Sequence, residues 1–176
     1  MKWFRVLGLL VVATTAAVSL TASPAHADTP PVVIENLNDG FCLQPAGESA
    51  DLGASIVQEF CLTDHLTQSW VFHSLGGSSY QVENTQTHLC LDAFGGAANG
   101  TPVVQWTCAN ISNQKWNAIV TPSQVTITLV SQVAGTHTHC LDVPGAQGTL
   151  GLAMQLFACN NSAAQVWALR DSNPEF

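Results

Sequence analysis

Residues 90–116 read CLDAFGGAANGTPVVQWTCANISNQKW, and two further stretches of the chain follow the same plan. Each copy contains a Cys-Leu phrase, a second cysteine 18 or 19 positions later, and then a Gln-x-Trp triplet. The triplets are Gln68-Ser69-Trp70, Gln114-Lys115-Trp116 and Gln165-Val166-Trp167. Three ordered anchors at near-constant offsets indicate three copies of one structural unit. The expected copies span about residues 32–75, 79–121 and 124–170.

The six cysteines are all part of this repeat. Six cysteines allow 15 connectivities, and the repeat favours the simplest, which joins the two cysteines of each copy. Each bridge would close a loop of about twenty residues and stabilise the fold by roughly 3 kcal/mol on the chain-entropy model. The expected pairs are Cys42–Cys61, Cys90–Cys108 and Cys140–Cys159.

A metal site would have to use the same thiols. The chain has no Cys-x-x-Cys pair, and its one metal-like cluster is His137-Thr138-His139-Cys140. Without ligands at zinc-site spacing, this cluster is better explained as a polar strand edge beside a bridged cysteine. We therefore expect neither a metal ion nor another cofactor.

The N-terminus has the features of a secretory signal peptide. Lys2 and Arg5 precede an apolar stretch over residues 6–20, and Ala25-His26-Ala27 provides a small-x-small cleavage signature. The apolar stretch is shorter than the roughly 20 residues of a spanning helix, and hydroxyl side chains interrupt it. We expect a signal peptide over residues 1–27 and a secreted, extracellular domain over residues 28–176.

The mature chain would be strongly acidic. Loss of residues 1–27 leaves Lys115 and Arg170 as the only cations against twelve Asp and Glu residues, a net charge of −10 with His neutral. Two cations cannot neutralise a row of phosphates, which argues against nucleic acid and anionic membranes as partners. The remaining polar residues are rich in Asn, Gln, Ser and Thr, which suit neutral polar ligands.

Local patterns within each copy are extended. Segments such as Trp70-Val71-Phe72-His73 and Tyr80-Gln81-Val82-Glu83 alternate between apolar and polar residues at period two. Pairs such as Gly76-Gly77 and Gly95-Gly96 mark turns between them. We expect about four short strands per copy, and hence roughly twelve strands in one closed all-β domain.

These anchors resemble those of the ricin-type β-trefoil lectins, which overlap with the family 13 carbohydrate-binding modules. The resemblance covers about Val32 to Arg170, essentially the whole mature chain. It implies an all-β β-trefoil of three four-stranded repeats with pseudo-threefold symmetry, one disulfide per repeat and one potential shallow sugar pocket in each. It also implies that Trp70, Trp116 and Trp167 are core residues.

The resemblance further implies which residues form a pocket. A carboxylate accepts hydrogen bonds from sugar hydroxyls, an aromatic ring covers the apolar face of the sugar, and amides fix its orientation. In the second repeat Val104 stands where the family often has Gln, although the adjacent Gln105 could substitute in a shifted register. Core burial is the alternative role for Trp106, and a turn held by backbone amides is the alternative for Asp92. The expected residues are Asp92, Trp106, Asn113 and Gln114.

The other two repeats depart further from the family pattern. In the third repeat Ala164 replaces the Asn, and the residues that match are Asp142, Gln155, Phe157 and Gln165. The first repeat has Gln44, Val57, Glu59 and Thr67 at the corresponding positions. Without an ionised acceptor or a stacking ring, we expect the first repeat to bind no sugar.

Together these features predict a secreted, monomeric carbohydrate-binding protein that is not an enzyme. Galactose-type and xylan-type glycans are both compatible with the resemblance. Two weak pockets on one rigid body would favour a polymeric glycan as partner. The chain shows no Gly-x-Ser-x-Gly or His-Glu-x-x-His motif, and its cysteines are committed to bridges.

Two other functions stay open on the sequence. The first is a trefoil with decayed sugar sites that binds a protein or inhibits a protease through the long segment Ser131–His139. The second is a module that targets a separately encoded enzyme.

Overall fold

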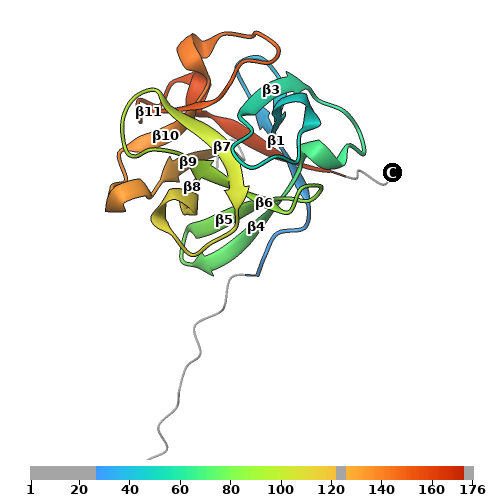
Figure 1. The fold of residues 1–176 in the computed structure, drawn as a ribbon. Coiled ribbons are helices and arrows are strands. Elements are labelled where there is room, and N and C mark those ends of the chain that lie inside the picture. The colour runs from blue at the N-terminus through green and yellow to red at the C-terminus, as the bar shows by residue number, and fades with distance from the viewer. Residues whose placement is uncertain (1–26, 122–125, 173–176) are drawn as a thin grey trace, which may run out of the picture.

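The structure, a computed structural model, describes residues 27–121 and 126–172, so the predicted signal peptide lies outside the described residues except for Ala27. These residues form twelve β-strands and six short 3-10 helices (Figure 1). The strands are β1 (Val32–Asn36), β2 (Phe41–Pro45), β3 (Ile56–Phe60), β4 (Ser69–Gly76), β5 (Ser79–Asn84), β6 (Leu89–Ala93), β7 (Thr101–Thr107), β8 (Trp116–Thr121), β9 (Thr126–Ser131), β10 (His139–Asp142), β11 (Gln155–Ala158) and β12 (Trp167–Asp171). The 3-10 helices are η1 (Ala46–Glu48), η2 (Leu66–Gln68), η3 (Ser112–Gln114), η4 (Val133–Gly135), η5 (Pro144–Ala146) and η6 (Ala163–Gln165).

The strands form three groups of four with the same pairing pattern. In each group the first strand pairs with the second and the fourth, and the second pairs with the third. The pairs β4–β5, β8–β9 and β12–β1 join neighbouring groups, so six strands close into a ring. The hairpins β2–β3, β6–β7 and β10–β11 lie outside that ring. The predicted β-trefoil with three four-stranded repeats is confirmed.

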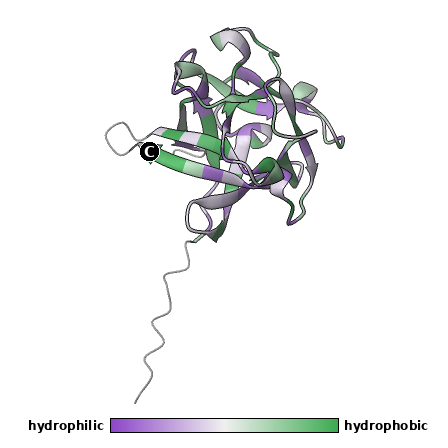
Figure 2. Cartoon of the chain, turned by 90° about the vertical axis from the view of Figure 1, so that its left-hand side faces the viewer, coloured by the Kyte–Doolittle hydropathy of each residue, from purple (hydrophilic) through white to green (hydrophobic). Residues whose placement is uncertain are grey.

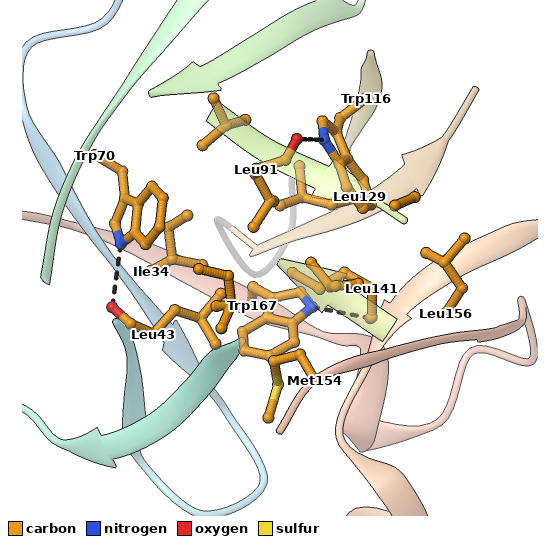
Figure 3. Packing of buried hydrophobic residues seen from close by; sticks show 14 of the residues in the cluster. Ile34, Leu43, Trp70, Leu91, Trp116, Leu129, Leu141, Met154, Leu156 and Trp167 are labelled. Carbon is orange, nitrogen blue, oxygen red and sulfur yellow. Dashed lines mark hydrogen bonds between the residues drawn. The ribbon is translucent and has the colours of Figure 1, made fainter. Parts of the chain in front are cut away.

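One tryptophan from each Gln-x-Trp triplet fills the centre of this ring. Trp70, Trp116 and Trp167 are completely buried, and their indole nitrogens donate to the backbone carbonyls of Leu43, Leu91 and Leu141 at 3.1, 3.0 and 3.4 Å. Figure 3 shows the three rings among aliphatic side chains, each directed at its leucine carbonyl. Each buried indole therefore has an acceptor, which it needs once it is removed from water.

The disulfides repeat with the same symmetry. Each joins the first strand of an outer hairpin to the end of the second, and the Cα atoms of the bonded cysteines lie 5.0 to 5.1 Å apart. The pairs are Cys42–Cys61, Cys90–Cys108 and Cys140–Cys159, as predicted. Each bridge therefore fixes the open end of one hairpin.

Hydrophobic and hydrophilic stretches both occur along the strands (Figure 2). In the β8–β9 hairpin, Ile119 and Val120 are exposed, whereas Ile127 and Leu129 face the core. Among the described residues no helix is long and apolar enough to span a membrane.

Candidate functional site

The glutamine of each Gln-x-Trp triplet lies fully buried beneath an outer hairpin. In the second repeat, Gln114 Nε2 donates to Asp92 Oδ2 and to the Thr107 carbonyl, each at 2.9 Å. Gln114 Oε1 accepts from the backbone N–H of Ala109 at 2.7 Å and from Gln81 Nε2 at 3.0 Å. Both hydrogens on Nε2 are thus used within the protein. Gln114, predicted as a sugar contact, instead holds the carboxylate of Asp92 in place.

The same arrangement occurs in the other two repeats. Gln165 Nε2 donates to Asp142 Oδ2 at 3.0 Å and to the Ala158 carbonyl at 3.1 Å. Gln68 Nε2 donates to Gln44 Oε1 and to the Phe60 carbonyl, each at 2.8 Å. The Gln-x-Trp motif therefore places its Trp in the core. Its Gln holds the side chain that lies two positions after the first cysteine of the repeat, which is Gln44, Asp92 or Asp142.

The third repeat contains an open cavity of about 180 Å³. Asp142 is only 4% exposed, and its Oδ1 accepts a 2.8 Å hydrogen bond from Gln155 Nε2. Phe157, 36% exposed, also lines this cavity. Together with the bond from Gln165, the bond from Gln155 occupies one lone pair on each carboxylate oxygen and leaves further acceptor capacity. The cavity thus combines a fixed acceptor with an aromatic ring.

Strand register brings these side chains together. On the β10–β11 hairpin, Asp142 pairs with Gln155 and Cys140 with Phe157. Directly opposed residues of an antiparallel pair lie on the same face, and so do residues two apart on one strand. Asp142, Gln155 and Phe157 therefore face one side of the hairpin, as the resemblance to the lectin family implied. Two more lining residues, Asn160 and Ser162, were not predicted.

The position of Asn160 carries a signal in the sequence. Asn160 directly follows Cys159, whereas the corresponding residues of the first and second repeats are Leu62 and Ala109. Its Oδ1 accepts from the Ser162 backbone N–H at 2.9 Å, which closes a turn at the cavity rim. A polar residue at this position in one repeat alone was the available clue.

The second repeat has the predicted carboxylate and aromatic ring on one face. Asp92 pairs with Val104, and Cys90 with Trp106, across the β6–β7 hairpin. Trp106 is 37% exposed, so the alternative of core burial is wrong for it. Gln114, and not a turn of backbone amides, holds Asp92.

Asp92 lies in an unusual environment. It is 3% exposed, and its Oδ1 is buried with no hydrogen-bond partner, because Val104 occupies the position of Gln155 in the third repeat. Burial raises the pKa of Asp92, and the amides of Gln114 and Asn113 offset part of that rise. A buried acceptor without a partner carries an unmet desolvation cost, which a hydroxyl donor from a ligand would relieve.

A phenylalanine covers part of the Trp106 ring. Phe94 stacks on Trp106 with ring centroids 5.6 Å apart and an interplanar angle of 29°. Gly53, from the first repeat, lies so close to Trp106 that an added Cβ would be 3.2 Å from the indole Cζ3. Asn113 Nδ2 donates to the Ala93 carbonyl at 3.2 Å and so fixes the loop that begins after β6. Sequence reasoning did not identify Phe94, since its position outside the family pattern gave no signal.

The strand register is not shifted, so Gln105 does not take the place of the glutamine that Val104 replaces. The register Leu91↔Gln105 puts its side chain on the face opposite Asp92. There Gln105 is fully buried and its Nε2 donates to the carbonyls of Ser49 and Asp51 at 2.7 and 3.0 Å. Gln105 therefore joins the second repeat to a loop of the first and does not contribute to the pocket.

The first repeat also has a cavity, of about 390 Å³. Gln44 and Glu59 line it, in the places that Asp142 and Phe157 take in the third repeat. Thr67 binds the ring of His65 through its hydroxyl at 2.7 Å. This cavity thus lacks the predicted pairing of a carboxylate floor with an aromatic wall at these positions.

No group of three or more His, Cys, Asp or Glu side chains within residues 27–121 and 126–172 could hold a metal ion. In the His137–Cys140 segment, Cys140 is disulfide-bonded and the His137 ring contacts the Asn117 amide.

The profile of the ricin-type beta-trefoil lectin domain-like family matches residues 20–106 and 66–147, which together make up more than half of the chain. No curated protein matches the chain. The designed threefold-symmetric protein ThreeFoil has a similar structure, with a TM-score of 0.74 and 22% identity over 80% of this chain and 98% of ThreeFoil.

Two natural proteins show the same likeness. An exo-beta-1,3-galactanase from Clostridium thermocellum gives a TM-score of 0.74 with 23% identity over 81% of this chain, which spans only 30% of that enzyme. A ricin B-like lectin from Macrolepiota procera, solved in complex with lactose, gives a TM-score of 0.67 with 20% identity over 88% of this chain and 99% of the lectin. At these identities the likeness concerns the fold.

Proposed function

Because the chain belongs to the ricin-type beta-trefoil lectin domain-like family, we propose that it is a non-catalytic carbohydrate-binding protein. The observation that carries this proposal is the third-repeat cavity, where Asp142 is fixed by two glutamines beside the exposed ring of Phe157. A sugar can donate hydroxyls to the carboxylate and place its apolar face on the ring. We assign the second repeat, with Asp92 and Trp106, as a further pocket.

The chemistry of the cavity favours binding over catalysis. Glycoside hydrolysis needs two carboxyl groups about 5 to 9.5 Å apart. Asp142 is the only carboxylate among the described residues that line the third-repeat cavity. One acceptor and one ring suffice to hold a sugar but not to supply both a general acid and a nucleophile or base.

The physical setting of the pockets suggests the kind of target. A shallow, wet pocket makes few contacts, and a millimolar dissociation constant corresponds to only about −4 kcal/mol. Two such pockets on one rigid body gain affinity when a single polymer engages both. We therefore propose that the protein is secreted through the signal peptide of residues 1–27 and binds polymeric glycans of galactose or xylan type as a monomer.

The test is a titration of the protein against immobilised glycans and polysaccharides, beside Asp142→Ala. We expect this variant to lose at least about tenfold in affinity, since hydrogen bonds to a charged acceptor contribute about 1.5–3 kcal/mol. Asp64→Asn is the matched control, because it removes a carboxylate from an exposed turn away from the cavity.

The control should bind like the wild type. If the folded wild-type protein binds no glycan, the proposal fails, and protein partners of the segment Ser131–His139 become the next candidates.

A further inference from the structure

The second repeat holds the parts of a sugar pocket, but an aromatic side chain covers one of them. Asp92 offers a buried Oδ1 atom without a partner, and Trp106 offers an aromatic ring on the same face of the hairpin. Phe94 stacks on that ring at a centroid distance of 5.6 Å. Phe94 itself is 51% exposed, so core packing does not explain its position.

The stacked rings leave no space for a sugar between them. Carbon atoms in contact lie about 3.5–4.0 Å apart, so a sugar ring held between two aromatic rings needs them about 7–8 Å apart. At 5.6 Å, Phe94 therefore blocks a sugar from stacking on the face of Trp106 that it covers.

We propose that Phe94 acts as a built-in plug of the second-repeat pocket and that a glycan binds there by displacing it. This inference rests on the proposed function, because it concerns access to one of the two sugar pockets. The incoming sugar exchanges one stacking partner of Trp106 for another and donates a hydroxyl to Asp92 Oδ1. The plug thus lowers the affinity of this pocket and favours ligands that supply that hydroxyl.

The chain around Phe94 suits such a movement. Phe94 directly follows β6, and its backbone N–H donates to the Pro102 carbonyl at 3.0 Å. Gly95 and Gly96 come next, at φ angles of +115° and +127°, where a Cβ at either position would meet no atom within 4 Å. Two unpacked glycines allow the backbone to change direction next to the ring at small cost. Asn113 holds the base of this loop at Ala93, so the movement is confined to the segment beyond it.

The plug is a feature of one repeat only. Pro144 stands at the equivalent position two residues after Asp142, and Ala46 stands two residues after Gln44. Neither side chain carries an aromatic ring, and cavities are open in both of those repeats. The second and third pockets should therefore differ in access although they share an Asp and an aromatic wall.

The binding test isolates the second pocket in the Asp142→Ala background, with lactose and xylotriose as probes in calorimetric or NMR titrations. We expect Phe94→Ala in this background to bind at least one of these sugars about two- to tenfold more tightly, the range that corresponds to the loss of one aromatic stacking contact. A further Asp92→Ala substitution should abolish that gain. Ile119→Ala, which truncates an exposed apolar side chain on β8, is the matched control and should leave the affinity unchanged.

A second measurement follows the ring contact without any sugar. Trp70, Trp116 and Trp167 are fully buried, so Trp106 is the tryptophan that acrylamide can reach among the described residues. Subtracting the fluorescence of the Trp106→Phe variant from that of the wild type isolates the fluorescence of Trp106. Phe94→Ala should increase the quenching of Trp106 fluorescence by acrylamide. Unchanged quenching would show that Phe94 does not cover Trp106 in solution.

The outcomes separate the two proposals. Unchanged or weaker binding by Phe94→Ala overturns the plug, as does a gain that survives Asp92→Ala. If the wild type binds glycan but neither Asp142→Ala nor Asp142→Ala with Phe94→Ala binds any, the second pocket is no sugar site. The proposed function then stands on the third repeat. If neither the wild type nor Phe94→Ala binds any glycan, both proposals fail.

Discussion

Asp92 sits in the folded protein at an energetic cost. Its carboxylate is almost fully buried, one oxygen has no partner, and burial raises its pKa. Asp142 is buried to the same extent, but glutamines donate to both of its oxygens. The replacement of one glutamine by Val104 thus explains why the two equivalent carboxylates differ. A buried carboxylate with a raised pKa and an oxygen without a partner is a candidate for ligand binding.

We predict that Asp92→Asn stabilises the protein at pH 7 by about 1 kcal/mol, the size of a typical single-substitution effect, because burial raises the pKa of Asp92 and makes its charged form unfavourable in the fold. An asparagine still accepts the hydrogen bond from Gln114 through its oxygen, and it has no charge to desolvate. The raised folded-state pKa fixes the pH dependence of the effect. The wild-type penalty is full above that pKa and absent below the unfolded value of 3.8, so the advantage of the variant should vanish in acid.

Urea unfolding of both proteins between pH 3 and pH 7 measures this difference. Asp64→Asn, which removes a carboxylate from an exposed turn, is the control and should have no comparable effect. An Asp92→Asn protein that is less stable than the wild type at pH 7 would show that the buried charge is favourable, contrary to the argument. The same variant should also bind glycan more weakly through the second pocket, so stability and binding should change in opposite directions.

At the scale of single elements, the Gln-x-Trp triplet with its 3-10 helix is the unit that keeps each outer hairpin attached to the barrel. Gln68 shows this best, because its repeat lacks the predicted sugar-binding residues. Its side chain donates to Gln44 Oε1 and the Phe60 carbonyl and accepts from the Leu62 N–H at 2.8 Å. The role of this glutamine is therefore structural whether or not a pocket is present.

We predict that Gln68→Ala destabilises the protein by about 2–4 kcal/mol, because it leaves several buried polar groups without partners at about 1–3 kcal/mol each. Thermal or urea unfolding measures the loss. Gln86→Ala changes an exposed glutamine and should alter the stability by less than about 0.5 kcal/mol. Equal effects of the two substitutions would contradict the structural role of the motif.

The elements that the sequence predicted best are those that recur. Cysteine pairs and four strands per copy follow from anchors present three times, and each repetition supports the others. The resemblance to a known family added the core role of the tryptophans. Side-chain direction on a single strand was harder, because a shift of one residue moves a side chain to the other face. Gln105 illustrates this limit: its chemistry suited the pocket, yet the register turns it toward a loop of the first repeat. The Phe94–Trp106 stack depends on how a glycine-containing loop folds back, which no periodicity encodes.

At the scale of the whole molecule, side chains from one repeat hold the loops of another. Gln58 Nε2 donates to the carbonyls of Gln147 and Thr149 in the third repeat, just as Gln105 binds a loop of the first. Leu156 takes the corresponding place in the third repeat and cannot make such bonds. The pseudo-threefold symmetry therefore holds for the backbone, while polar contacts and pockets have diverged. One consequence is that the pockets can differ in affinity without any change of scaffold.

The start of the described chain is tied to the same barrel through a charged contact. Thr29 N–H donates to the Phe72 carbonyl at 3.1 Å, and the Ser74 N–H donates to Asp28 Oδ1 at 2.8 Å. The ring of His73 lies between two carboxylates, with Nδ1 2.9 Å from Asp28 Oδ2 and Nε2 3.0 Å from Glu83 Oε2. Both nitrogens can donate only in the protonated imidazolium.

Burial of His73 opposes its charge, but Asp28 and Glu83 outweigh that effect and raise its pKa above 6.5. Glu83 also contacts the ring of His88, at 2.9 Å. A raised folded-state pKa means that the contact stabilises the protein fully below about pH 6.5, and that this contribution is lost as the pH rises through the folded value. Because the contact between His73 and the two carboxylates is largely exposed and screened by solvent, we expect only a small loss of stability.

The prediction is that unfolding midpoints in urea fall between pH 6 and pH 9 for the wild type, and that His73→Gln lacks this part of the decline. The two proteins should differ most at the acidic end of this range, where the imidazolium bridges both carboxylates, and should converge as the pH rises. His137→Gln is the matched control, since that exposed ring contacts an amide, Asn117 Nδ2. Its stability should follow the wild type at every pH. A difference between wild type and His73→Gln that stays constant from pH 6 to pH 9 would mean that His73 contributes packing alone, and that the charged contact does not hold the N-terminal segment on the barrel.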